Sequence, residues 1–140
     1  MKILLAVDGS AHTKKMLAYL VTHEELFGGH NSFALLTVQP QLPSHARSMV
    51  GKEAVDTYYR EESEKVLGPA SQFLSRHGIN PKSVAKVGHA GETICKVAES
   101  GKFDMVVMGS HGHGVFGNLV MGSVATQVMA RSQVPVLMVR

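Results

Sequence analysis

The chain has 140 residues, about the length of one globular domain. Hydrophobic residues make up 44% of it and charged residues 18%, a balance that excludes an intrinsically disordered chain. The formal net charge of +3 is too small to indicate a nucleic-acid-binding protein, which usually carries a concentrated basic patch.

The single cysteine, Cys95, excludes an intramolecular disulfide and is typical of a reducing compartment. The apolar run at the N-terminus reaches Asp8 too soon for a signal peptide. No apolar stretch approaches the ~18 residues that suggest a membrane span. We therefore expect a cytoplasmic protein with neither nucleic acid nor membrane as a partner.

The first half of the chain alternates short apolar runs with helical patterns. Lys2–Val7 is apolar after its first residue, as expected of a strand that is buried on both faces. Asp8–Ser10 predicts a turn that ends in a helix N-cap, and the helix should continue until a pair of glycines stops it. Phe33–Val38 predicts a second buried strand. A long helix is expected from about Lys52 to His77, which Pro69 should kink or divide into two segments.

The second half continues the alternation. Three further apolar runs predict strands at Val84–Val87, Met105–Met108 and Val134–Val139. Helical patterns separate them, over Glu92–Ser100 and Ser123–Arg131. The predicted order of elements is therefore βαβαβαβαβ.

This alternation predicts an α/β protein: an open, doubly wound, Rossmann-like parallel sheet of five strands with helices on both faces. We expect one domain over residues 1–140, because no linker, internal repeat or low-complexity segment interrupts the pattern. The usual strand order of such a sheet is 3-2-1-4-5. Ligands then bind beyond the carboxyl ends of strands 1 and 4, where the strand order reverses.

The loop after the fourth strand is dense in glycine. Its five glycines are Gly109, Gly112, Gly114, Gly117 and Gly122. The pair Gly122-Ser123 stands directly before the last predicted helix, whose first N–H groups and dipole attract anions. We therefore expect a phosphate site here, with Ser123 as both helix N-cap and hydroxyl donor. A glycine-rich surface loop with a capping serine is the alternative interpretation. No Asp or Glu follows Asp104, so this segment has no carboxylate that would repel an anion.

Three other motifs do not account for this loop. The segment from Gly112 to Gly117 matches G-x-G-x-x-G, but a dinucleotide fingerprint belongs to the first βα turn and has an acidic residue about 20 positions later. No segment supplies a Walker A loop. His111 and His113 alone do not form a recognised zinc pair, so any metal ligands remain unknown. No catalytic residues are predicted, since nucleophile elbow, paired carboxylates and motif-placed general base are all missing from the sequence.

The segment Gly109-Ser110-His111-Gly112, nine residues, then Gly122-Ser123 resembles the G-2x-G-9x-G-[ST] motif of the ATP-binding branch of the universal stress protein family. The resemblance extends over the whole chain. Further segments similar to the family's first, second, fourth and last strands are Ala6–Ser10, Leu35–Val38, Asp104–Gly112 and Val134–Val139.

The resemblance implies a stress-response or signalling regulator that binds ATP or AMP and interacts with partners according to its nucleotide state. Mg²⁺ is the natural companion of a triphosphate. The residues that it implies for nucleotide binding are Ala6, Val7, Asp8, Val38, Met108, Gly109, His111, Gly112, Gly122, Ser123 and Val124.

Several of these implied roles have a plainer alternative. Asp8 is expected near the ribose hydroxyls, because a carboxylate accepts hydroxyl hydrogen bonds and repels phosphate, but it is also a turn-forming residue. Val38 and Met108 are expected at the adenine, or else are ordinary core residues. His111 either contacts the ligand or only shapes its loop.

Two departures from the family pattern concern the phosphates. Ala125 stands where a second hydroxyl residue often follows the Gly-Ser pair, and Asn118 stands where a basic residue is common. The sequence therefore leaves open which of ATP, ADP and AMP is preferred.

The resemblance also implies a homodimer through Val134–Val139, whose apolar edge should be covered. A slow ATPase and a nucleotide-free dimeric scaffold are the alternative functions, while a transferase would need catalytic residues that the sequence does not supply.

Overall fold

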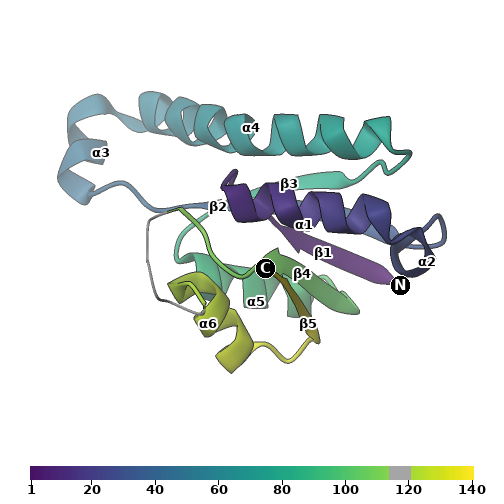
Figure 1. Cartoon of the computed structure of the whole chain (residues 1–140). Coiled ribbons are helices and arrows are strands. Elements are labelled where there is room, and N and C mark those ends of the chain that lie inside the picture. Colours follow the sequence, from purple (N-terminus) through teal and green to yellow (C-terminus); the bar gives the residue numbers. More distant parts are fainter. Residues whose placement is uncertain (114–120) are drawn as a thin grey trace.

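Residues 1–113 and 121–140, which the computed structural model describes, form one parallel sheet of five strands with the order β3-β2-β1-β4-β5 (Figure 1). The strands are β1 (Lys2–Ala6), β2 (Ser32–Gln39), β3 (Lys82–Val87), β4 (Met105–Gly109) and β5 (Val136–Val139). Every neighbouring pair is parallel. The predicted fold class and strand order are confirmed, and the order reverses between β1 and β4.

Helices cover both faces of the sheet. One face carries α1 (Ala11–Thr22) and α4 (Lys52–Arg76), and the other carries α5 (Ala90–Ser100) and α6 (Ser123–Arg131) (Figure 1). Two short helices, α2 (Glu24–Phe27) and α3 (Ser44–Val50), lie in the connections. Within the described part of the chain, no helix is both long and apolar enough to cross a membrane.

Each face of the sheet has its own hydrophobic core. Along β1, Ile3 and Leu5 pack toward α1 and α4, whereas Leu4 packs toward α5 and α6. All three are fully buried, and each such side chain contributes about 1.5–3 kcal/mol to stability. Burial on both faces explains why the strand reads as a continuous apolar run.

The bounds of several elements differ from those predicted. β3 begins two residues before the predicted Val84, and β5 begins two residues after the predicted Val134. α5 begins at Ala90 rather than Glu92. The first predicted helix is interrupted at His23, whose backbone (φ −120°, ψ 59°) is not helical, so α1 and α2 are separate.

The predicted division of the long helix at Pro69 is wrong, because α4 runs without interruption from Lys52 to Arg76. Proline has no N–H to donate to the carbonyl of Lys65, which weakens the helix locally. Leu67 and Leu74, one on each side of the proline in sequence, are buried against the sheet and hold the two halves of α4 in place.

Candidate functional site

A pocket lies at the carboxyl ends of β1 and β4, where the strand order reverses. All the residues predicted to bind nucleotide line it, except Gly122 and Ser123. The lining residues are Ala6, Val7, Asp8, Thr13, Leu36, Val38, Ala90, Ile94, Met108, Gly109, His111, Gly112, Val124 and Ala125. The topology therefore brings together two segments that lie about a hundred positions apart in the sequence. Gly114, Gly117 and Asn118 fall outside the described residues.

The turn after β1 fixes the carboxylate of Asp8. Its Oδ1 accepts hydrogen bonds from the backbone N–H of Ser10 (2.9 Å) and from the hydroxyl of Thr13 (2.8 Å). The backbone N–H of Asp8 in turn donates to Thr13 Oγ1 at 3.0 Å. The other oxygen, Oδ2, lies directly beside Gly112. The turn-forming role of Asp8 thus uses Oδ1 alone, which leaves Oδ2 oriented toward the loop after β4.

The glycines of the 2-and-9 spacing stand where the chain is closely packed, and Gly109 and Gly112 leave too little room for a side chain. A Cβ atom at Gly109 would lie 2.8 Å from the Cβ of His12, and one at Gly112 would lie 2.6 Å from Oδ2 of Asp8. A Cβ atom at Gly122 would lie 3.3 Å from the Cα of His111. The three glycines therefore let the end of β4, its loop and the start of α6 approach the first βα turn.

The start of α6 differs from the prediction by one residue. Gly122 is the N-cap, with extended backbone (φ −74°, ψ 169°), and its carbonyl accepts from the backbone N–H of Thr126 at 3.0 Å. The predicted N-cap role of Ser123 is therefore wrong, since Ser123 is the first helical residue. The first turn of α6 has no acidic residue, and its first N–H groups have no helical acceptor. This end of the helix favours an anion.

Three histidines, His12, His111 and His113, lie close to the first βα turn and the loop after β4. The rings of His12 and His111 lie with centroids 4.7 Å apart, and Oγ of Ser110 lies 2.9 Å from Nδ1 of His111. His113 Nε2 lies 2.6 Å from the backbone oxygen of Asp8. Burial lowers the pKa of His12, the nearby His111 and Lys15 lower it further, and the Asp8 carboxylate opposes them. Among the described residues, no group of three His, Cys, Asp or Glu side chains is placed to hold a metal ion.

Sequence reasoning missed part of the pocket wall. Thr13 belongs to the first turn of α1, immediately after the predicted N-cap Ser10, and that proximity was the available signal. Leu36 pairs with Ala6 in the sheet, so the strand order alone places it at the site. Ala90 and Ile94 of α5 were also missed, whereas Ala125 of α6 was already expected beside the phosphates.

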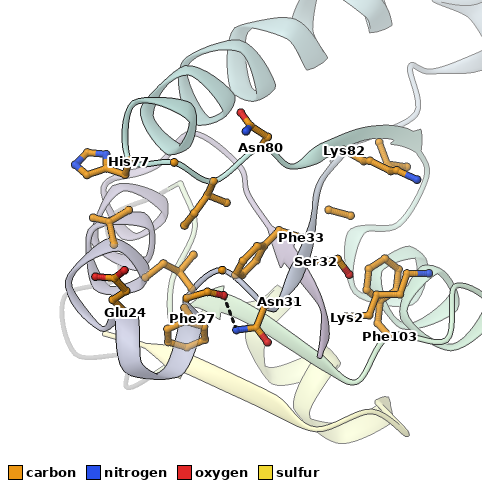
Figure 2. A pocket seen from close by; sticks show the side chains of 18 residues that line it. Lys2, Glu24, Phe27, Asn31, Ser32, Phe33, His77, Asn80, Lys82 and Phe103 are labelled. Carbon is orange, nitrogen blue, oxygen red and sulfur yellow. Dashed lines mark hydrogen bonds between the residues drawn. The ribbon is translucent and has the colours of Figure 1, made fainter.

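A larger cavity lies at the opposite edge of the sheet, beside the amino ends of β1, β2 and β3 (Figure 2). Its volume is about 810 Å³, against about 80 Å³ for the pocket between β1 and β4. Phe33 lies near its centre, with Glu24 and His77 toward one end and Lys82 toward the other. The carboxyl ends of α1 and α4 are directed to this edge, and their dipoles disfavour a phosphate there. Volume alone therefore does not identify the anion site.

Several solved structures have the same fold as this chain. A structure of protein MJ0577, from Methanocaldococcus jannaschii, superposes with a TM-score of 0.83, at 27% identity, over 99% of this chain and 94% of that one. A universal stress protein from Archaeoglobus fulgidus in complex with dAMP gives a TM-score of 0.67, at 21% identity, over 100% and 98% of the two chains. An Arabidopsis thaliana family protein with AMP bound gives 0.70, at 15% identity, over 99% and 90%.

Sequence comparison agrees. A universal stress protein of Thermus aquaticus is 31% identical over 140 residues, which are 99% of this chain and 97% of the relative. Universal stress protein Slr1230 of Synechocystis sp. is 34% identical over 139 residues, which are 99% of this chain but 42% of that longer protein. The family model for the universal stress protein family matches residues 1–140. The chain therefore belongs to the universal stress protein family.

Proposed function

We propose that the chain binds an adenine nucleotide, AMP or ATP, in the pocket between the carboxyl ends of β1 and β4. One observation carries this proposal: an oriented carboxylate and the amino end of a helix flank the same pocket. Oδ2 of Asp8 suits the ribose hydroxyls, which donate hydrogen bonds. The amino end of α6, with no acidic residue in its first turn, suits the phosphates.

The apolar part of the pocket suits the base. Val38, Ile94 and Met108 line it, from β2, α5 and β4 respectively. A volume of about 80 Å³ holds only part of a nucleotide, so the rest of the ligand would lie over the rim beside Gly112 and the start of α6. The dAMP and AMP bound by two proteins of the same fold support a nucleotide of this class.

The residues at the start of α6 bear on how many phosphates the site holds. Ala125 is buried and carries no hydroxyl, so it offers no side-chain donor to a phosphate oxygen. A triphosphate would bring Mg²⁺ held chiefly by its own oxygens and by water. We therefore propose AMP as the simplest ligand to test first, with ADP and ATP as comparisons.

Thermal unfolding with AMP, ADP and ATP, each with and without Mg²⁺, tests the proposal. A ligand present at 100 times its Kd adds roughly 2.7 kcal/mol to the free energy of unfolding. The Gly122→Val variant should lose this stabilisation, because a side chain there meets the backbone of His111. Gly29→Ala is the control, since a Cβ atom at Gly29 meets no atom within 4 Å. The absence of stabilisation by every adenine nucleotide would contradict the proposal.

We further propose that the protein acts in the cytoplasm as a homodimer whose nucleotide state controls a partner protein. β5 lies at the edge of the sheet, and Val136, Leu137 and Met138 along it are only half-buried. Pairing with a second copy would cover this apolar edge. Sedimentation velocity with and without AMP measures the assembly.

Slow ATP hydrolysis is an alternative function. Phosphate release over hours, compared between the native chain and the Gly122→Val variant, tests it.

A further inference from the structure

A groove runs along the outer surface between α1 and α4. Its volume is about 580 Å³, and its apolar floor includes Leu17, Val66 and Phe73. Leu17 is buried, while Val66 and Phe73 are half-buried and pack against the core beneath them. The floor therefore offers apolar surface to a ligand that lies across both helices.

The rim of the groove is basic. Lys14 of α1 and Lys65 and Arg76 of α4 line it, and all three are exposed. Among the described residues, no carboxylate lines it. Lys65 is paired with Glu62 at 2.8 Å, so its charge is partly offset. Lys14 and Arg76 take part in none of the ion pairs found among the described residues. The charge that the groove presents is thus positive at both walls.

We propose that this groove binds an acidic amphipathic helix of a partner protein. From Lys65 to Arg76 the α4 wall spans about 16 Å, at 1.5 Å per residue, which is about three turns of a helix laid along it. Apolar side chains at i, i+3, i+4 and i+7 of such a helix would contact the floor. Glutamates or aspartates on its flanks would pair with Lys14 and Arg76, which favours an acidic partner over a basic one.

The groove also adjoins the turn after β1. Gly9 and Thr13 line the groove, and Thr13 lines the pocket between β1 and β4 as well. The proposal itself does not rest on nucleotide binding, because the floor and the rim are formed by α1 and α4. The groove is a different surface from the pocket between β1 and β4, and binding to it can be measured without nucleotide.

Fluorescence anisotropy with a labelled synthetic helix tests this proposal. The probe has about fourteen residues, with leucines at i, i+3, i+4 and i+7 and glutamates on the flanks. The double variant Lys14→Glu/Arg76→Glu should bind it about tenfold more weakly than the native chain does. The matched control is Lys15→Glu/Arg60→Glu, which makes the same change of charge on the same two helices at exposed residues outside the groove. Added salt should weaken binding to the native chain.

Three outcomes would overturn the proposal. The first is no saturable binding of the acidic helix, and the second is equal loss of affinity in the two double variants. The third is self-association of the native chain that Lys14→Glu/Arg76→Glu abolishes in sedimentation, since the occupant would then be a second copy. Far-UV circular dichroism of each variant checks folding. The single variants Lys14→Gln and Arg76→Gln, which remove charge without reversing it, replace a double variant that does not fold.

Discussion

The carboxylate of Asp8 and the backbone of Gly112 are packed so closely that a Cβ atom at residue 112 would lie 2.6 Å from Asp8 Oδ2. This contact joins the turn after β1 to the loop after β4. It gives a physical reason for a glycine at this position even without ligand, because any side chain would displace the carboxylate that faces the pocket. The same contact sets the distance between the expected ribose acceptor, Asp8, and Gly112, which belongs to the proposed phosphate site.

Gly112→Ala should weaken AMP binding at least about tenfold, or 1.4 kcal/mol, because the methyl group displaces Oδ2 of Asp8. The added methyl group should also lower the free energy of unfolding by about 1–3 kcal/mol. Isothermal titration calorimetry and urea unfolding measure the two effects. The control is Gly29→Ala, where the added methyl group meets open space. Unchanged affinity in Gly112→Ala would mean that this contact does not shape the site.

Asp8→Asn should separate the two roles of that side chain. The amide keeps an Oδ1 that accepts from Ser10 and Thr13, so the unliganded Tm should change little. The group toward Gly112 becomes an N–H donor, which the ribose hydroxyls match less well, so AMP affinity should fall about tenfold. Asp8→Ala removes the turn acceptor as well, and we expect it to lose about 1–3 kcal/mol of stability. Equal AMP affinity for the native chain and Asp8→Asn would contradict the ribose assignment.

Protonation of His12 should lower the stability of the folded protein in acid. Burial, with His111 and Lys15 nearby, lowers the pKa of His12 below its ordinary 6.5, so the folded chain binds this proton less readily than the unfolded chain. The part of the free energy of unfolding that comes from neutral His12 is fully present above pH 6.5. It is lost as the pH falls through the lower pKa that His12 has in the folded chain. Between about pH 7.5 and about pH 5.5 the Tm should therefore fall more in the native chain than in His12→Gln.

The control for this pH measurement is His45→Gln, which replaces an exposed histidine of α3. It should keep the full acid sensitivity of the native chain. Parallel Tm curves for the native chain and His12→Gln would show that His12 does not carry the effect.

Pro69→Ala should stabilise the protein. The alanine restores an N–H inside a continuous helix and removes the steric clash of the ring with the preceding turn. We expect the free energy of unfolding to rise by about 1–3 kcal/mol, after about 0.4–1 kcal/mol is lost because the unfolded chain becomes less restricted. Pro81→Ala, directly before β3, is the control and should show only that smaller loss. A lower stability of Pro69→Ala would mean that the proline stabilises α4.

The strand order and the position of the pocket could be predicted because both follow from periodicity. β1 and β4 are continuous apolar runs, and their loops meet wherever parallel strands reverse their order. α3 could not be predicted in this way, because none of its residues is buried and its sequence has no apolar face to recognise. β3 is mostly exposed, which explains why its first two residues, Lys82 and Ser83, carried no strand signal.

Other features depend on packing that no local pattern encodes. The continuity of α4 through Pro69 is maintained by burial of its neighbours against the sheet, and tertiary packing outweighs the local preference. The cap of α6 is set one residue early because Gly122 donates its N–H to the carbonyl of Ser110 at 2.8 Å. The place of His12 beside Gly109 depends on how α1 docks on β4.

Thr13 lines both the pocket between β1 and β4 and the groove between α1 and α4. Its hydroxyl forms hydrogen bonds with the backbone N–H and the carboxylate of Asp8, and the residue also borders the groove between α1 and α4. Replacement by valine would erase the hydroxyl and keep the shape, whereas replacement by serine would keep the hydroxyl and remove a methyl group. Because one residue lines both cavities, a substitution that improves one of them is constrained by the other, in engineering as in evolution.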